Sequence, residues 1–134
     1  MAETFHLQIV TPDKPVFDGT AEKLIVRTIT GDVCILARHI DYAAALGIGE
    51  ARVTDGEGNT RIAACNGGLL SVSDNQVRVM ATTFEWADEI DTERARLSLN
   101  ASQEALSKAD RSDANYAALE AKLKRALVRV QITE

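Results

Sequence analysis

The sequence predicts a two-part protein, an antiparallel β-sandwich or barrel followed by a C-terminal hairpin of two α-helices. All 8 Gly, both Pro and all 3 Phe lie before residue 88. Glycine and proline mark turns, whereas their absence permits long helices. The hydrophobic period also changes at this point, from two residues to that of a helix. We therefore expect a β domain at residues 1–87 and a helical domain at residues 88–134.

Short segments of strand character recur every 8 to 12 residues or so through the first part, as in antiparallel sandwiches and barrels. The first alternates apolar and polar residues, so His6 is expected to face solvent. The run Val33–Leu36 is continuously apolar and is expected to be buried on both faces. Loops at 55–59 and 73–75 are expected to close hairpins. The expected strands span residues 5–10, 24–28, 33–36, 51–54, 60–63, 69–72 and 76–80.

Two helical stripes follow Asp91, which is expected to cap the first helix. The segment Asp110–Asp113 interrupts the pattern and offers a second cap. Two helices of about 17 residues joined by so short a link should pack antiparallel. Because the stripes are rich in alanine, we expect the hairpin to detach at modest cost. The stripes contain Ala95, Leu99, Ser102, Leu106 and Ala109 in the first helix, and Tyr116, Leu119, Leu123, Ala126 and Val130 in the second.

Charge and hydropathy exclude several partners. Fifteen Lys and Arg against twenty Asp and Glu give a net charge of -5, so we expect no nucleic-acid partner. Apolar runs are far shorter than the roughly 20 residues that span a bilayer, so no direct membrane insertion is expected. The segment Met1–His6 has neither a basic leader nor an apolar core, so we expect no secretory signal and a cytosolic location.

Few residues point to catalysis. Cys34 and Cys65 lie in apolar segments and are expected to be reduced core residues. The pair Gly67-Gly68, between two expected strands, is interpreted as a tight turn. The sequence has no nucleophile elbow, phosphate loop or metal-ligand spacing. We expect no catalytic or metal site, and the alternative of a small enzyme would have to use Cys34 and His39.

Basic residues gather on the expected hairpin. Lys122, Arg125 and Arg129 are spaced by three and four and share one face of the second helix. In an antiparallel hairpin, Arg94 of the first helix lies near Arg129. Three guanidinium groups can clamp a polyphosphate, with Asp91 or Glu85 accepting from a ribose or an amino group. The alternative is a solvated basic face with scattered ion pairs.

Several motifs, in this order and with this change from strands to helices, resemble the epsilon subunit of the bacterial F-type ATP synthase. The resemblance covers essentially the whole chain. It departs from the usual family residues at Cys34, Ala37 and Ile40–Tyr42. Ala101 stands about where some ATP-binding members have an arginine. The motifs lie at residues 5–12, 16–19, 21–22, 31–39, 67–72, 90–95 and 122–129.

The resemblance implies a β-sandwich of about ten strands with a two-helix C-terminal domain. It also implies a non-catalytic central-stalk subunit on the cytoplasmic face of the bacterial cell membrane, attached peripherally as part of the complex. Such a subunit couples proton translocation to ATP synthesis and contacts the gamma subunit and the membrane rotor ring. Its helices can extend into the catalytic alpha/beta head and inhibit ATP hydrolysis. Residues expected at partner contacts are Gly31, Arg38, His39 and Asp41.

Some family members bind ATP in the compact hairpin through an Ile-Asp-x-x-Arg-Ala motif and arginines of the second helix. The resemblance therefore implies ATP as a regulatory ligand, with no cofactor required. The remaining alternative is a free-standing nucleotide-sensing module that binds ATP without a large partner. The nucleotide-binding residues implied are Glu85, Ile90, Asp91, Arg94, Ala95, Arg125 and Arg129.

Overall fold

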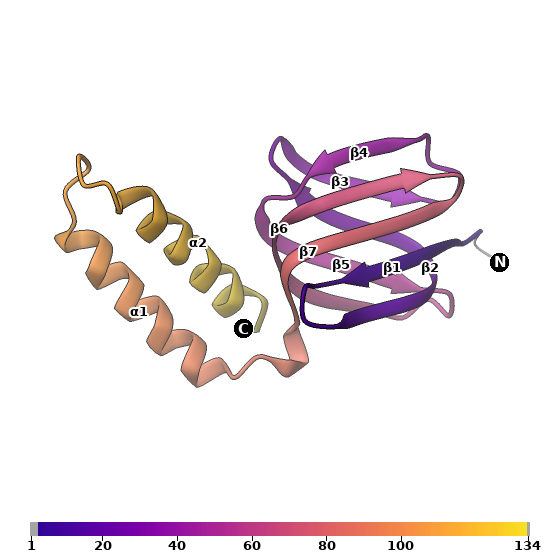
Figure 1. Ribbon diagram of the computed structural model, residues 1–134. Coiled ribbons are helices and arrows are strands. Elements are labelled where there is room, and N and C mark those ends of the chain that lie inside the picture. Colours follow the sequence, from indigo (N-terminus) through magenta and orange to yellow (C-terminus); the bar gives the residue numbers. More distant parts are fainter. Residues whose placement is uncertain (1–2, 134) are drawn as a thin grey trace.

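The computed structural model describes residues 3–133, a β domain followed by a helical hairpin (Figure 1). Met1 and Ala2, on which the expected lack of a secretory signal partly rests, lie outside the described residues. The bounds of the elements are β1 Phe5–Val10, β2 Pro15–Thr28, β3 Gly31–Leu36, β4 Tyr42–Ala45, β5 Ile48–Asp55, β6 Thr60–Ser73, β7 Gln76–Trp86, η1 Ala87–Glu89, α1 Thr92–Lys108 and α2 Tyr116–Thr133.

The strands close on themselves into a sandwich. β1 pairs antiparallel with β2 and parallel with β7, which closes the order β1-β7-β6-β5-β2. β3 pairs with β2, and β4 pairs with β6. Because alternate side chains of each strand point inward, the interior is filled by apolar residues from every side. The largest fully buried side chains are Leu7, Ile9, Leu24, Val26, Ile35, Leu70 and Val79.

The β-sandwich is confirmed, but the described residues form seven strands rather than about ten. β2 pairs with β1 over its first half and with β3 and β5 over its second. β6 pairs first with β5 and then with β4, while β7 accompanies it along its length. β2 and β6 are long strands of 14 residues each. β2 begins well before the strand expected at 24–28, and β6 contains both strands expected at 60–63 and 69–72.

The glycine pair explains the continuity of β6. Gly67 and Gly68 do not form the expected tight turn but lie inside the strand, with φ of 64° and 115°. A Cβ atom at Gly68 would overlap the carbonyl oxygen of Met80 on β7. Glycine therefore lets the two strands approach closely at this bend, and the segments expected at 60–63 and 69–72 are one strand.

The expected double burial of Val33–Leu36 is wrong. Ile35 is buried, but Cys34 and Leu36 are exposed. Among the described residues β3 pairs with β2 alone, so it is an edge strand with one face open to solvent. Cys34 is therefore not a core residue. Cys65 is buried as predicted, and its burial raises the pKa of the thiol to about 12.

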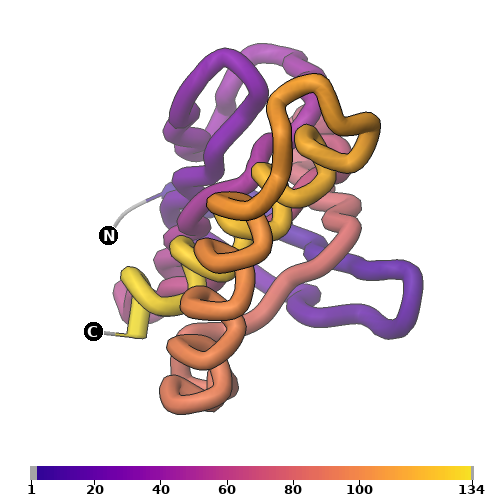
Figure 2. Tube along the Cα trace, turned by 90° about the vertical axis from the view of Figure 1, so that its left-hand side faces the viewer, coloured from indigo at the N-terminus to yellow at the C-terminus, as the bar shows by residue number. Residues whose placement is uncertain are grey.

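The hairpin follows its expected pattern closely. Asp91 caps α1 by accepting a hydrogen bond from the backbone N–H of Arg94 at 3.2 Å. In the link, the carboxylates of Asp110 and Asp113 each accept a hydrogen bond from the backbone N–H two residues on. Every residue of the two predicted stripes is buried or half-buried. α1 and α2 pack along each other in front of the β domain (Figure 2).

The hairpin rests on the sandwich mainly through α2, which packs on β5, β6 and η1. A small second core, separate from that of the sandwich, lies at this junction. Its buried members are Ala64, Ile90, Ala95 and Val130, and Leu99, Val128 and Ile132 pack against them partly buried. Neither α1 nor α2, as described within residues 3–133, has the length and apolar composition of a membrane-spanning helix.

Candidate functional site

A groove of about 550 Å³ separates α2 from the sandwich. The β1–β2 loop forms one side, β6, β7 and η1 form the floor, and α2 with one residue of α1 forms the other side. Cationic side chains project from both walls. The lining residues are Thr11, Asp13, Lys14, Asn66, Thr82, Thr83, Phe84, Glu85, Glu89, Ser98, Lys122, Arg125, Ala126 and Arg129.

An ion pair joins the two domains in this groove. Nε of Arg129 on α2 lies 3.0 Å from Oε1 of Glu85 on β7. Its Nη2 lies 3.5 Å from Oε2. The Nε contact is electrostatic, because its geometry does not make a hydrogen bond. The two side chains are 24% and 39% exposed, so solvent partly screens the attraction.

The cations differ in what surrounds them. Arg129 is partly neutralised by Glu85, whereas Lys14 and Lys122 are exposed at the rim and Arg125 is half-buried. Guanidinium and ammonium groups arranged in this way can bind an anionic group such as a phosphate.

The floor of the groove is polar where β6 meets β7. Asn66 is 8% exposed, and its Nδ2 donates a hydrogen bond to Oγ1 of Thr83 at 2.9 Å. Its Oδ1 is buried and has no hydrogen-bond partner in the described part of the chain. A buried hydrogen-bond acceptor that the described residues leave unpaired therefore lies beneath the floor of the groove.

The structure brings together only some of the residues predicted to bind nucleotide. Glu85, Arg125 and Arg129 line the groove, whereas Arg94 is exposed on α1 and is not part of the lining. The expected convergence of three guanidinium groups is therefore reduced to the two on α2. Of the other predicted residues, Asp91 caps α1, and Ile90 and Ala95 lie in the small core at the junction of the domains.

The predicted partner contacts lie at two places. Arg38 and Asp41 lie beside the β6–β7 turn: the backbone N–H of Arg38 donates to Oδ1 of Asn75 at 2.8 Å, and Asp41 accepts from the backbone N–H of Asp74 at 3.3 Å. Gly31 begins β3, at the opposite end of that strand from Arg38.

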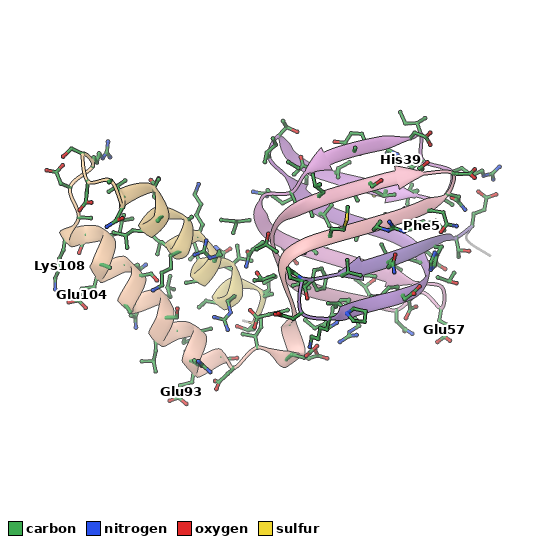
Figure 3. The ribbon with its side chains drawn as sticks, viewed as in Figure 1. Phe5, His39, Glu57, Glu93, Glu104 and Lys108 are labelled. Atoms are coloured by element: carbon green, nitrogen blue, oxygen red, sulfur yellow. The ribbon has the colours of Figure 1, made fainter. Side chains whose placement is uncertain are left out.

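His39 lies at the end of the sandwich farthest from the hairpin (Figure 3). Its Nδ1 is 2.7 Å from the carbonyl oxygen of Ile40, and its ring lies edge-on to Tyr42 at 5.8 Å. Arg38 beside it forms an ion pair with Glu3. No hydrogen bond between His39 and Cys34 occurs in residues 3–133, so the geometry gives the small-enzyme alternative no support.

Sequence reasoning missed Asn66, Thr83 and Lys14 as groove residues. Reading Gly67-Gly68 as a turn hid the pairing of Asn66 with Thr83 across continuous strands. Lys14 lies in the loop between Pro12 and Pro15, and nothing in the local sequence shows that this loop reaches the hairpin. The alternation of side chains along a strand could have revealed the floor of the groove. Ala64 and Asn66 are two residues apart and share one face of β6, and Thr83 and Glu85 share one face of β7 in the same way.

A β-sandwich with a docked two-helix hairpin, and a groove of mixed charge between them, is the architecture of a two-domain protein with a candidate binding site at the domain junction. The family model for the ATP synthase delta/epsilon chain beta-sandwich domain matches residues 4–87, and that for the delta/epsilon chain long alpha-helix domain matches residues 88–134. The chain belongs to the ATP synthase delta/epsilon chain family. It is accordingly a non-catalytic subunit of that complex, of the central-stalk type.

Sequence relatives support this family assignment over nearly the full length of the chain. The chain is 38% identical to the ATP synthase epsilon chain of Ruminococcus albus, covering 96% of this chain and 95% of the relative. It is 35% identical to that of Geobacter sulfurreducens, covering 98% and 95%. The fold matches a chain in the Euglena gracilis mitochondrial ATP synthase with a TM-score of 0.81, 21% identity and coverage of 92% and 78%.

Proposed function

We propose that this chain works as the epsilon-type subunit of a bacterial ATP synthase, joining the gamma subunit, the membrane rotor ring and the catalytic alpha/beta head. It would lie on the cytoplasmic face of the cell membrane as a peripheral part of the complex and couple proton translocation to ATP synthesis. The observation that carries this proposal is the match of both domains, in order, to the delta/epsilon family.

The helical hairpin is proposed to regulate ATP hydrolysis. Its contact with the sandwich is small and centres on Ala64, Ile90, Ala95 and Val130, which favours detachment at modest cost. Opened into one rod, the segment from residue 92 to residue 133 would span about 65 Å at 1.5 Å per residue. That length suits an arm that reaches from the stalk into a neighbouring catalytic head.

ATP is proposed as a regulatory ligand of the groove. Arg125, Lys122 and Lys14 are placed to hold phosphates, and Arg129 can share a phosphate with Glu85. A ligand that bridges α2 and the sandwich binds only the docked hairpin. It therefore favours the docked form by RT ln(1 + [L]/Kd) and opposes inhibition.

Two variants test the groove. Arg125→Ala removes a charged contact and should weaken ATP binding to the isolated chain about tenfold or more. Arg94→Ala should have the smaller effect, since Arg94 is not part of the groove lining. Isothermal titration measures both, and wild-type affinity in both variants would contradict the proposed site.

The assembly proposal is tested by co-sedimentation. The catalytic head with its gamma subunit, lacking this chain, is mixed with the full chain and centrifuged. We expect the chain to sediment with the head and to slow ATP hydrolysis. An Arg38→Glu variant should sediment less with a complex that includes the rotor ring, and Arg96→Glu on α1 provides a comparison of equal charge change. A chain that binds ATP yet never sediments with the complex would favour the free-standing nucleotide sensor instead.

A further inference from the structure

The loop at residues 37–41 connects β3 to β4 and contains an unfavourable backbone conformation. Arg38 has a φ of 62°, which costs free energy for a residue other than glycine or asparagine. Its own turn is closed by the N–H of His39, which donates to the carbonyl oxygen of Leu36 at 3.2 Å. Because a strained conformation persists where surrounding groups hold it, the loop depends on contacts from other segments.

Asn75, in the turn between β6 and β7, supplies such contacts. Its Oδ1 accepts a hydrogen bond from the backbone N–H of Arg38 at 2.8 Å, and its Nδ2 donates to the carbonyl oxygen of Thr4 at 3.0 Å. Its backbone carbonyl oxygen accepts from the N–H of His6 at 3.3 Å. Figure 1 shows the start of β1 and this turn at the end of the sandwich opposite the hairpin. One residue therefore joins the loop, the turn and the N-terminal strand.

Two further contacts lie at the same junction. Arg38 forms an ion pair with Glu3, with Nε 3.0 Å from Oε2, and Asp41 accepts a hydrogen bond from the backbone N–H of Asp74 at 3.3 Å. The side chains of the ion pair are 73% and 61% exposed, so water screens their attraction. Asn75 is half-buried and contacts the strained residue directly, so it is the stronger constraint on the loop.

The identity of this residue suits both of its tasks. The backbone of Asn75 has a φ of 61°, and asparagine adopts this conformation more readily than most other residues with a side chain. Glycine would fit the turn but has no amide to reach Arg38 and Thr4. The asparagine amide has a donor at one end and an acceptor at the other, as these two neighbours require.

We propose that Asn75 positions the 37–41 loop for contact with the rotor ring, so that the loop meets the ring in a preformed conformation. The loop contains Ile40, which is 78% exposed and whose burial at an interface would be favourable. A preformed loop loses less conformational entropy on binding. This inference rests on the proposed contact of this loop with the ring and adds the residue that holds the loop in place.

Asn75→Gly tests the proposal, because it keeps the positive φ and removes the amide. Co-sedimentation over a range of concentrations should show about tenfold weaker binding to a complex that includes the rotor ring. Asp74→Gly is the matched control: its φ is 54°, and no hydrogen bond or ion pair of its side chain occurs within residues 3–133. This control should bind within about twofold of the wild-type chain.

Two further measurements separate positioning of the loop from general stability. Hydrogen exchange of the Arg38 amide in the isolated chain should be about tenfold faster in Asn75→Gly than in the wild-type chain or in Asp74→Gly, since its acceptor is gone. Asn75→Asp keeps an acceptor for this amide and loses the donor to Thr4. It should therefore restore slow exchange of the Arg38 amide and binding within about threefold of the wild-type chain. Thermal melting checks that each variant is folded.

The outcomes distinguish this inference from the proposed ring contact. Rapid exchange of the Arg38 amide in the wild-type chain would overturn the role of Asn75, and this result depends on no variant and no partner. Wild-type binding by a folded Asn75→Gly chain, or an equal loss in Asp74→Gly, would overturn it as well. If the wild-type chain binds no more tightly when the ring is present than to the head with gamma alone, the ring contact itself fails, and this inference fails with it.

Discussion

Single residues set the local geometry on which both domains depend. Gly68 lets β6 pass close to β7, and this passage brings Asn66 opposite Thr83 on the groove floor. Arg38, Asp74 and Asn75 take up left-handed φ values of 62°, 54° and 61° at the far end of the sandwich. Polar side chains and glycines, rather than further apolar burial, thus position both candidate contact regions.

Gly68→Ala should lower the free energy of unfolding by about 2 kcal/mol or more, because φ is 115° and the added methyl group meets the carbonyl oxygen of Met80. Gly58→Ala is the matched control: its φ is 88°, but a Cβ there meets nothing within 4 Å. Urea unfolding of both variants separates the effect of the atomic overlap at Gly68 from that of the positive φ angle, which the two glycines share. Equal losses of unfolding free energy in the two variants would show that close packing at Gly68 does not cause the destabilisation.

His6 should titrate above its ordinary pKa of 6.5. Its Nδ1 lies 2.8 Å from Oε1 of Gln76 and its Nε2 lies 2.5 Å from Oδ1 of Asp18, and these hydrogen bonds favour the protonated ring. The resulting stabilisation is fully present below pH 6.5 and is lost as pH rises through the raised folded-state pKa. NMR titration should show the pKa fall in Gln76→Ala. An unchanged pKa of His6 in this variant would mean that the Gln76 side chain does not raise it.

Helices, strands and turns were predicted correctly from the sequence where a single local pattern determines them. The helical stripes, the Asp91 cap and the hairpins closed at 55–59 and 73–75 were predicted correctly, because periodicity and turn residues act over a few positions. The edge position of β3 and the continuity of β6 were not, because they depend on strand partners distant in sequence. The same limit hid Asn66, whose place in the groove depends on pairing between β6 and β7.

Helix α1 contains a polar group that its packing leaves unsatisfied. Ser102 is 3% exposed, and its Oγ has no hydrogen-bond partner in the described chain. Ser102→Ala removes the buried hydroxyl and favours the helix, so it should raise the free energy of unfolding of the hairpin by about 1 kcal/mol. Hydrogen exchange of α1 amides measures this, with the exposed Ser107→Ala as comparison. Destabilisation would show that the hydroxyl has a partner in solution.

At the scale of the molecule, the protein combines a sandwich that has a large hydrophobic core with a helical hairpin, α1 and α2, that is attached through a small core. We call this hairpin the arm. The sandwich core extends through all its layers, whereas the arm is held by a small cluster and the Arg129–Glu85 ion pair. The groove lies between the two parts, so a ligand that contacted both walls would favour the docked arrangement. Under the proposed function, a released hairpin would find a target in the catalytic head of the complex.

The most direct test of this account is inhibition of ATP hydrolysis by a chain whose arm is loosened. Val130→Ala removes buried methyl groups from the cluster with Ala64, Ile90 and Ala95 and should weaken docking by about 2 kcal/mol. Leu127→Ala, on the same helix but 39% exposed, is the control. Each chain is added to a catalytic head that lacks this subunit, and the concentration that halves ATP hydrolysis is measured. This concentration should be about fivefold or more lower for Val130→Ala than for the wild-type chain and the control. Equal potency of the three chains, or weaker inhibition by Val130→Ala, would contradict the arm as a regulator held back by docking.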